Sequence, residues 1–248
     1  MLPRPRRRGR PDGATEEWRA IARGPDILFH VCSWPDKREL WTEEEFYAVG
    51  RADWSDFRRQ WAHYAQALGG TCVEIGCGPG RVTAALAEDF GRVIAVDVSP
   101  DLLEIARGHV PPNVELRQVD GAVLPLGTAE ADAVFSVHVF QHLETVDVVT
   151  SYLSEIRRVL RPGGTAMLHI QTASSSPPIG VAAKNAIGLW RSRASLRRGG
   201  IHTHVRMRQY RDEEVLAMLT AAGLGDVELR LFPVRSNGFH HSFWLARR

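Results

Sequence analysis

Cysteine is scarce in this chain, and long apolar runs are absent. Three cysteines occur among the 248 residues, at Cys32, Cys72 and Cys77. Their number is odd and their spacing is not that of zinc ligands, so we expect reduced thiols, no disulfide framework and no metal site. No apolar stretch approaches the roughly 20 residues that a membrane-spanning helix needs. The arginine-rich start leads into polar residues and not into the apolar segment of a secretory signal, which favours a cytoplasmic protein.

Acidic residues are missing from two segments. Residues 1–10 contain five arginines and no acid, which leaves 26 basic and 29 acidic residues in the rest of the chain. We interpret residues 1–20 as a disordered basic tail, because arginine interleaved with proline and glycine is typical of solvated chain ends. Residues 173–209 contain seven lysines and arginines and again no acid. They could form a lid that recruits an anionic substrate through Arg197 and Arg198, or a solvated helix whose charges pair elsewhere.

The stretch Val73–Gly80, VEIGCGPG, joins a short apolar run to a glycine-rich turn. Three glycines within five residues let backbone amides approach a ligand closely, and the helix expected from Arg81 to Ala87 would point its N-terminus at that ligand. A dinucleotide-binding turn would need glycine in place of Arg81. The carboxylate of Glu74 suits an ammonium or a hydroxyl and not a pyrophosphate. Both residues therefore count against an NAD-type oxidoreductase.

The next two apolar runs also lead to a carboxylate. Residues 92–97 form a second expected strand, and its last residue, Asp97, can bind a ribose diol. Ser99 and Pro100 then begin a helix with a side-chain cap and a proline in the first turn. A third run, at residues 114–119, leads into Asp120.

The order E-x-G-x-G-x-G, followed by these strand ends, resembles the class I S-adenosylmethionine-dependent methyltransferases. The resemblance is specific over about residues 70–172 and looser over about residues 210–247. It implies that Asp97 holds the ribose hydroxyls, that Val98 lies against the adenine, and that Asp120 accepts a hydrogen bond from the adenine amine. S-adenosylmethionine would then contact Glu74, Gly76, Cys77, Gly78, Gly80, Asp97, Val98, Asp120, Gly121, Ala122, Val137 and His138.

The fold implied by the resemblance is an α/β, Rossmann-like sheet of seven mostly parallel strands, with an antiparallel last strand and helices on both faces. We expect a helical cap at residues 21–69 and a methyltransferase domain at residues 70–248, with residues 173–209 inserted as a lid after the fifth strand. Asp212 should cap a late helix, and Gly223 should end it. Apolar residues at spacings of three and four predict another helix packed on the sheet: Val146, Val149, Leu153, Ile156 and Leu160.

A capping box, TEEE, opens a helix in the N-terminal cap. A stripe of four aromatic residues and a leucine follows at helical spacing: Trp54, Phe57, Trp61, Tyr64 and Leu68. We expect Trp61 and Tyr64 to pack in the core. Phe46, Tyr47 and Trp54 could pack there as well, or could cap the site and face the sulfonium with their rings. Tyr47 is the candidate substrate contact among them, and for this residue the sequence favours neither core packing nor a contact with the site.

Methyl transfer requires an acceptor held in line with the methyl group and, for some acceptors, a base that removes a proton. In the methyltransferase fold the methyl group points toward the end of the fourth strand, where His138 and His142 are candidate bases. His142 could instead have a structural role only. Tyr210, His202 and His204 are further candidates, although a lone histidine in a loop is more often solvated than catalytic.

These residues favour an S-adenosylmethionine-dependent methyltransferase that modifies an O, N or C atom of a small metabolite, with an anionic acceptor as the narrower hypothesis. Methyltransferases that act on base amines carry an Asn/Asp-Pro-Pro-aromatic motif after the fourth strand, where this chain has SVHV at residues 136–139. No basic stripe with interleaved aromatics indicates nucleic acid. The alternatives are a non-catalytic cofactor-binding protein and an RNA or protein methyltransferase. The pattern does not specify the acceptor or the oligomeric state.

Overall fold

Seven strands form one mixed sheet in the computed structural model, which describes residues 13–24, 27–32, 41–65, 68–143, 145–172, 208–235 and 240–248. The strands are β1 (Thr71–Ile75), β2 (Arg92–Asp97), β3 (Val114–Gln118), β4 (Ala131–Ser136), β5 (Leu160–His169), β6 (Gly225–Pro233) and β7 (His240–Arg247). Their order is β3-β2-β1-β4-β5-β7-β6. Strands β1 to β5 are parallel, and β7 is antiparallel to both β5 and β6. The predicted sheet with an antiparallel last strand is confirmed.

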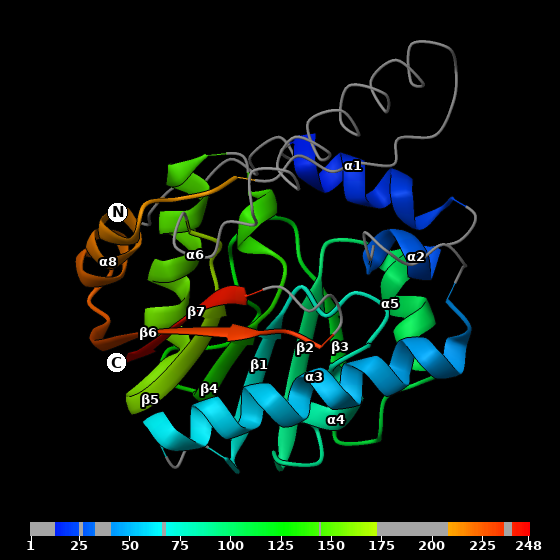
Figure 1. Ribbon diagram of the computed structural model, residues 1–248, viewed down its shortest axis with the longest axis horizontal. Coiled ribbons are helices and arrows are strands. Elements are labelled where there is room, and N and C mark those ends of the chain that lie inside the picture. The colour runs from blue at the N-terminus through cyan, green and yellow to red at the C-terminus, as the bar shows by residue number, and fades with distance from the viewer. Residues whose placement is uncertain are drawn as a thin grey trace, which may run out of the picture.

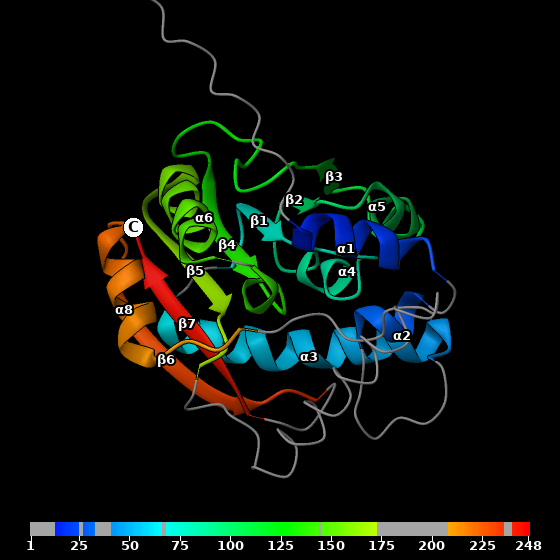
Figure 2. The same cartoon turned by 90° about the horizontal axis from the view of Figure 1, so that it is seen from above.

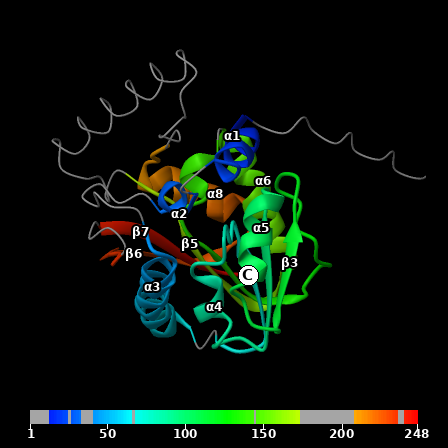
Figure 3. The same ribbon diagram turned by 90° about the vertical axis from the view of Figure 1, so that its right-hand side faces the viewer.

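Helices cover both faces of the sheet (Figures 1 and 2). One face carries α3 (Glu43–Tyr64), α4 (Thr83–Leu86) and α5 (Pro100–Arg107), and the other carries α6 (Val146–Val159) and α8 (Asp212–Ala221). The short helices α1 (Gly13–Ala22) and α2 (Ile27–Val31) precede α3, and a 3-10 turn, η1 (Phe140–His142), follows β4. Figure 3 shows α1 next to α5, beyond the ends of the strands.

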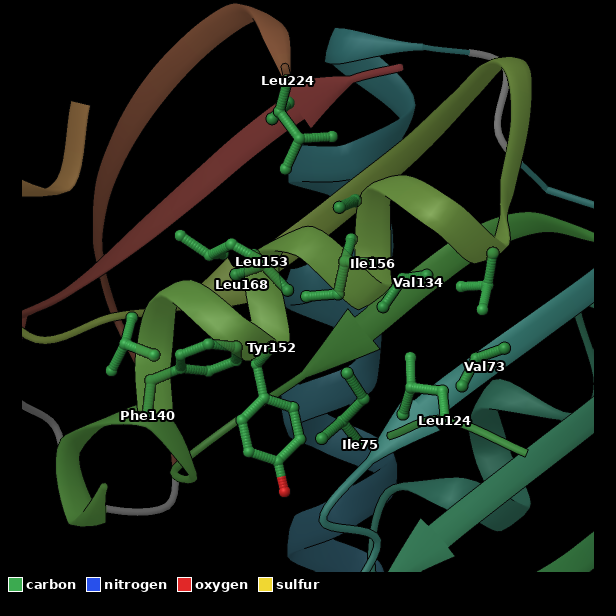
Figure 4. Packing of buried hydrophobic residues seen from close by; sticks show 14 of the residues in the cluster. Val73, Ile75, Leu124, Val134, Phe140, Tyr152, Leu153, Ile156, Leu168 and Leu224 are labelled. Atoms are coloured by element: carbon green, nitrogen blue, oxygen red, sulfur yellow. The ribbon is translucent and has the colours of Figure 1, made fainter. Parts of the chain in front are cut away.

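The face under α6 is closed by the apolar side of that helix (Figure 4). Tyr152, Leu153 and Ile156 are buried against strand residues such as Val134. The predicted stripe is thus correct in its middle and wrong at its ends, because Val146 lies in the first turn with 40% of its surface exposed and Leu160 already belongs to β5. The predicted stripe did not include Tyr152, which packs in this core and also lines the pocket described below.

The opposite face is packed by α3, a single helix of 22 residues. Its predicted capping box is present, because Thr42 Oγ1 accepts from the Glu45 amide and Glu45 Oε2 accepts from the Thr42 amide. Trp61 is fully buried, as predicted, and its Nε1 donates to Thr165 Oγ1 at 3.0 Å. Trp54 is also a core residue, with Nε1 donating to Asp89 Oδ2. The indole of Trp54 therefore packs α3 on the sheet and does not cap the site.

Three predicted boundaries are wrong. Residues 13–20, assigned to a disordered tail, form most of α1. The N-cap of α8 is Arg211 and not Asp212, because the Arg211 amide bonds to Glu214 while Asp212 already occupies the first turn. The helix after the glycines begins at Thr83 and not at Arg81, since tight turns occupy the intervening residues. Gly223 ends α8 as predicted, with a φ of +79° that favours glycine.

The proposed lid falls almost entirely on residues 173–207, which lie outside the described residues, together with the predicted candidates Arg197, Arg198, His202 and His204. Among the helices that the structure describes, none has the length and apolar character to cross a bilayer. Cys32, Cys72 and Cys77 are free cysteines in the structure.

Candidate cofactor site

A pocket opens where β1 and β2 end, and the glycine-rich turn forms its floor. The amides of Gly76 and Cys77 both donate to Val96 O, at 2.8 and 3.1 Å, which ties the turn to the end of β2. Gly76 has a φ of +73°, and a Cβ on it would lie 2.2 Å from a methyl carbon of Val139. Only glycine fits there, which lets the turn pack directly against Val139 on the pocket wall.

Asp97 fastens the same turn from the end of β2. Its Oδ2 accepts from the Gly78 amide at 2.8 Å and its Oδ1 accepts from the Ser99 amide at 2.9 Å. Burial raises the pKa of this carboxyl, and the nearby backbone amides of Ser99, Gly78 and Val98 oppose that shift. Each oxygen keeps a second lone pair, and Asp97 lines the pocket. It can therefore accept two more hydrogen bonds, as a vicinal diol would donate.

Glu74 is a buried acidic residue on the wall of the pocket. It is 3% exposed, and its Oε2 has no hydrogen-bond partner among the residues that the structure describes. Burial raises its pKa to about 7, against the lowering effect of nearby Arg81. A buried carboxylate oxygen without a hydrogen-bond partner is costly. A cationic group in the pocket would supply the missing partner.

These features fit S-adenosylmethionine. Glu74 can hold the ammonium, Asp97 can hold the ribose diol, and an apolar wall can take the adenine. Of the sequence candidates, those that line the pocket are Glu74, Gly76, Cys77, Gly78, Asp97, Val98, Gly121, Val137 and His138. Gly80 and Ala122 are not among the described residues that line it.

Asp120 is also absent from the described lining of the pocket, contrary to the expectation of an adenine contact. Its side chain is 65% exposed and pairs with Arg19 of α1. Arg19 Nε also donates to Val98 O at 2.9 Å. One guanidinium thus holds α1 against the loops after β2 and β3, and the neighbouring Trp18 lines the pocket. Sequence reasoning missed Trp18 and Arg19 because they lie in the segment assigned to the tail.

We expect Arg19→Ala to speed dissociation of S-adenosylmethionine about fivefold, because about 1 kcal/mol of hydrogen bonding that keeps α1 in place is lost. Stopped-flow displacement of the bound ligand measures this rate. Arg23→Ala is the matched control, since Arg23 lies in the turn just after α1 and pairs with Asp101 while 69% exposed. Equal rates for the two variants would contradict a specific role of Arg19.

A buried ion pair supports the far wall. Arg81 lines the pocket, and its Nη1 lies 2.6 Å from Asp53 Oδ2 of α3, with both side chains buried. The residue that breaks the dinucleotide pattern thus anchors the turn to α3. Gly50 permits this approach, because a Cβ on it would lie 1.9 Å from Arg81 O.

Phe46 and Tyr47 lie behind the turn. Both are buried, and neither is among the described residues that line the pocket. The Tyr47 hydroxyl donates to Pro79 O at 2.8 Å, and its ring stacks on His109. The described contacts favour packing over substrate contact for Tyr47.

The candidate bases are separated by the fold. His138 and His142 both line the pocket, with His142 edge-on to the ring of Trp18. Tyr210 is buried in the core under α6 and α8, and it is not among the described residues that line the pocket. Tyr152, which sequence reasoning missed, does line it and donates its hydroxyl proton to Gly121 O at 3.1 Å. The 3-4 spacing of the neighbouring apolar residues could have indicated Tyr152.

The strand order, the glycine turn and the two carboxylates at the ends of β1 and β2 define a class I methyltransferase fold. Residues 73–168 match the protein family described as "Methyltransferase domain". This part of the chain thus matches a methyltransferase domain, and the fold around it is that of the class I S-adenosylmethionine-dependent methyltransferases.

Two curated relatives share this part of the chain. N-demethylindolmycin N-methyltransferase of Streptomyces griseus is 39% identical over 101 residues, which cover 40% of this chain and 42% of the relative. Trans-aconitate 2-methyltransferase of Azoarcus sp. strain BH72 is 39% identical over 110 residues, which cover 43% of this chain and 41% of the relative. The matched residues thus span less than half the length of these relatives.

The fold extends the likeness beyond the matched residues. Magnesium protoporphyrin IX methyltransferase of Synechocystis PCC 6803, solved with bound SAH, aligns over 96% of this chain and 95% of its own with a TM-score of 0.60. The identity is 15%, so this comparison concerns the fold alone.

Proposed function

We propose that this protein transfers a methyl group from S-adenosylmethionine to a small-molecule acceptor. The observation that carries the proposal is the pair of buried carboxylates at neighbouring strand ends: Asp97 with lone pairs to spare, and Glu74 with an oxygen that no described residue contacts. The two curated relatives are named for small-molecule acceptors, N-demethylindolmycin and trans-aconitate.

The chain's own residues would act mainly by holding the cofactor and the acceptor in place and by excluding water. Glu74 would pair with the cofactor ammonium, Asp97 with the ribose hydroxyls, and Val98 would pack on the adenine. When bound, the cofactor supplies a methyl group activated by its sulfonium. His138, on the wall beyond β4, would accept the proton that an O–H or N–H acceptor releases.

An anionic acceptor is the narrower part of the proposal. Support comes from the seven cations between residues 173 and 209 and from the relative named for trans-aconitate, a tricarboxylate. Arg197 and Arg198 stay predicted substrate contacts, since they lie outside the described residues.

The test has a binding arm and a turnover arm. Calorimetric titration should show that S-adenosylmethionine and S-adenosylhomocysteine bind, and that NAD does not. The protein is then incubated with S-adenosylmethionine and trans-aconitate, and with a neutral amine acceptor for comparison, while release of S-adenosylhomocysteine is followed by mass spectrometry. Release that depends on trans-aconitate supports an anionic acceptor, and release with the amine alone contradicts it. Cofactor binding without release with any acceptor in a wider screen would favour the non-catalytic alternative, and absence of binding would overturn the proposal.

A further inference from the structure

Three histidines meet at the ends of three adjacent strands, beside the cofactor pocket. His138 follows β4, His169 ends β5, and His241 lies near the start of β7. One ring nitrogen from each lies within 4.8 Å of the others. His169 is fully buried and His241 is 6% exposed, while His138 lines the pocket. No described role of the cofactor site uses His169 or His241.

The hydrogen bonds of this cluster have a direction. The backbone amide of His138 donates to His169 Nδ1 at 3.2 Å. A neutral imidazole has one N–H, so accepting at Nδ1 leaves the proton of His169 on Nε2. That N–H then donates to His241 Nδ1, 3.0 Å away. The main chain of His138 thus determines the tautomer of both buried rings.

His138 needs such a restraint. Its φ is +59°, in the left-handed region that residues other than glycine rarely adopt and that costs about 1–2 kcal/mol. This conformation turns the chain out of β4 and places the His138 ring on the pocket wall. The bond to His169 Nδ1 is the contact that the described residues offer to the His138 amide.

We propose that His169 and His241 are positioning residues that hold His138 in the orientation in which its ring accepts the acceptor's proton. The proposal rests on the proposed methyl transfer. In the step, the acceptor atom forms its bond to the methyl carbon as the carbon–sulfur bond breaks, and the acceptor's proton moves to a ring nitrogen of His138. The sulfonium becomes a neutral thioether, so the positive charge passes from sulfur to the imidazole and the net charge of the site is unchanged.

The surroundings keep His138 neutral before that step. Burial lowers its pKa well below the usual value, and His169, His241, Arg81 and His142 lower it further. These are the titratable groups that face it from β5, from β7, from the glycine-rich turn and from η1. His138 is therefore unprotonated over the physiological range, as a group that accepts a proton must be before the step.

The same three imidazoles are a donor set that a divalent cation such as Zn²⁺ would accept. The hydrogen bonds argue against that use. Because His169 Nδ1 accepts from the His138 amide, its Nε2 carries the proton and has no lone pair for a metal. A metal could therefore bind only if the hydrogen bond from the His138 amide to His169 broke. Metal binding would contradict the proposal, and the test includes it as an outcome.

The test compares His169→Ala with His169→Asn, because the asparagine Oδ1 can replace Nδ1 as acceptor for the His138 amide. We expect His169→Ala to lower kcat about 10- to 100-fold with an amine or hydroxyl acceptor that the parent protein methylates, because only such an acceptor releases a proton. The dissociation constant of S-adenosylmethionine should change less than threefold. His169→Asn should recover most of the rate. The double variant His138→Ala/His169→Ala should be no slower than His138→Ala, since His169 acts through His138. His63→Ala, at an exposed position of α3, is the control.

A second measurement does not depend on turnover. Long-range ¹H–¹⁵N spectra of the labelled protein should show His169 as the neutral Nε2–H tautomer at pH 7. The Nδ1–H tautomer, additive losses in the double variant, or one zinc per chain that His169→Ala abolishes would each overturn the proposal. If the parent protein turns over no acceptor at all, the proposed function fails and the positioning role fails with it, whereas turnover that His169→Ala leaves intact removes the positioning role alone.

Discussion

Asp97→Ala is expected to weaken binding of S-adenosylmethionine at least about 100-fold. The carboxylate is asked to hold two ribose hydroxyls, and hydrogen bonds to a charged group contribute about 1.5–3 kcal/mol each. The variant also releases the amides of Gly78 and Ser99, so the glycine-rich turn loses one of its ties to β2. Calorimetry of the parent and the variant measures the change directly.

Asp132→Ala is the matched control for Asp97→Ala. Asp132 also accepts from a backbone amide, that of Thr71 at 2.7 Å, but near the start of β4, at the opposite end of the strands, where it also pairs with Arg161. It should cost stability and leave cofactor affinity within about twofold. If both variants bound the cofactor equally weakly, a general loss of packing would explain the effect and the assigned role of Asp97 would fall.

Glu74→Gln is expected to make the unliganded protein more stable while abolishing most cofactor binding. The folded-state pKa of Glu74 is raised from 4.5 to about 7, so the folded chain keeps a proton that the unfolded chain has lost. The cost of ionising the buried carboxyl therefore grows from pH 4.5 to about 7 and is complete above pH 7. By linkage the full cost is about 3 kcal/mol. Glutamine never ionises, so urea denaturation should show the variant's advantage at pH 8 and little of it at pH 4.5.

Ionisation of Glu74 should favour cofactor binding, although it destabilises the unliganded fold. The cofactor ammonium needs the ionised carboxylate, so affinity of the parent should fall about tenfold per pH unit below 7. Binding at pH 6.5 should also release protons, which calorimetry in two buffers of different ionisation enthalpy detects. Glu74→Gln should bind weakly with no such pH dependence. A parent affinity that is flat from pH 5.5 to 7.5 would mean that Glu74 does not face the ammonium.

The core of the site could be read from the sequence because it is local. Glu74, Gly76 and Gly78 belong to one short motif, and Asp97 follows as the end of the next strand, so the order of strands in the fold brings them together. The same reasoning gave the wrong role for Asp120. Its carboxylate pairs with the guanidinium of Arg19 in α1, 101 residues earlier, and does not line the pocket. No local pattern announces a partner at that distance.

The histidine cluster also could not be predicted from a local sequence pattern. His169 bonds to residues 31 and 72 positions away, on strands that are neighbours only in the folded sheet. Its sequence surroundings are those of an ordinary buried strand. The positive φ of His138 is equally invisible, since a histidine in sequence gives no sign of a left-handed backbone.

The placement of α1 bears on where this protein can be cut. The matched domain begins at residue 73, yet Trp18 and Val31 form part of the wall of the pocket. His241 lies far beyond the last matched residue, 168. An expression clone trimmed to residues 73–168 would keep Glu74 and Asp97 but would lose Trp18, Val31 and His241. Inactivity of such a fragment would therefore not be evidence against methyl transfer by the full chain.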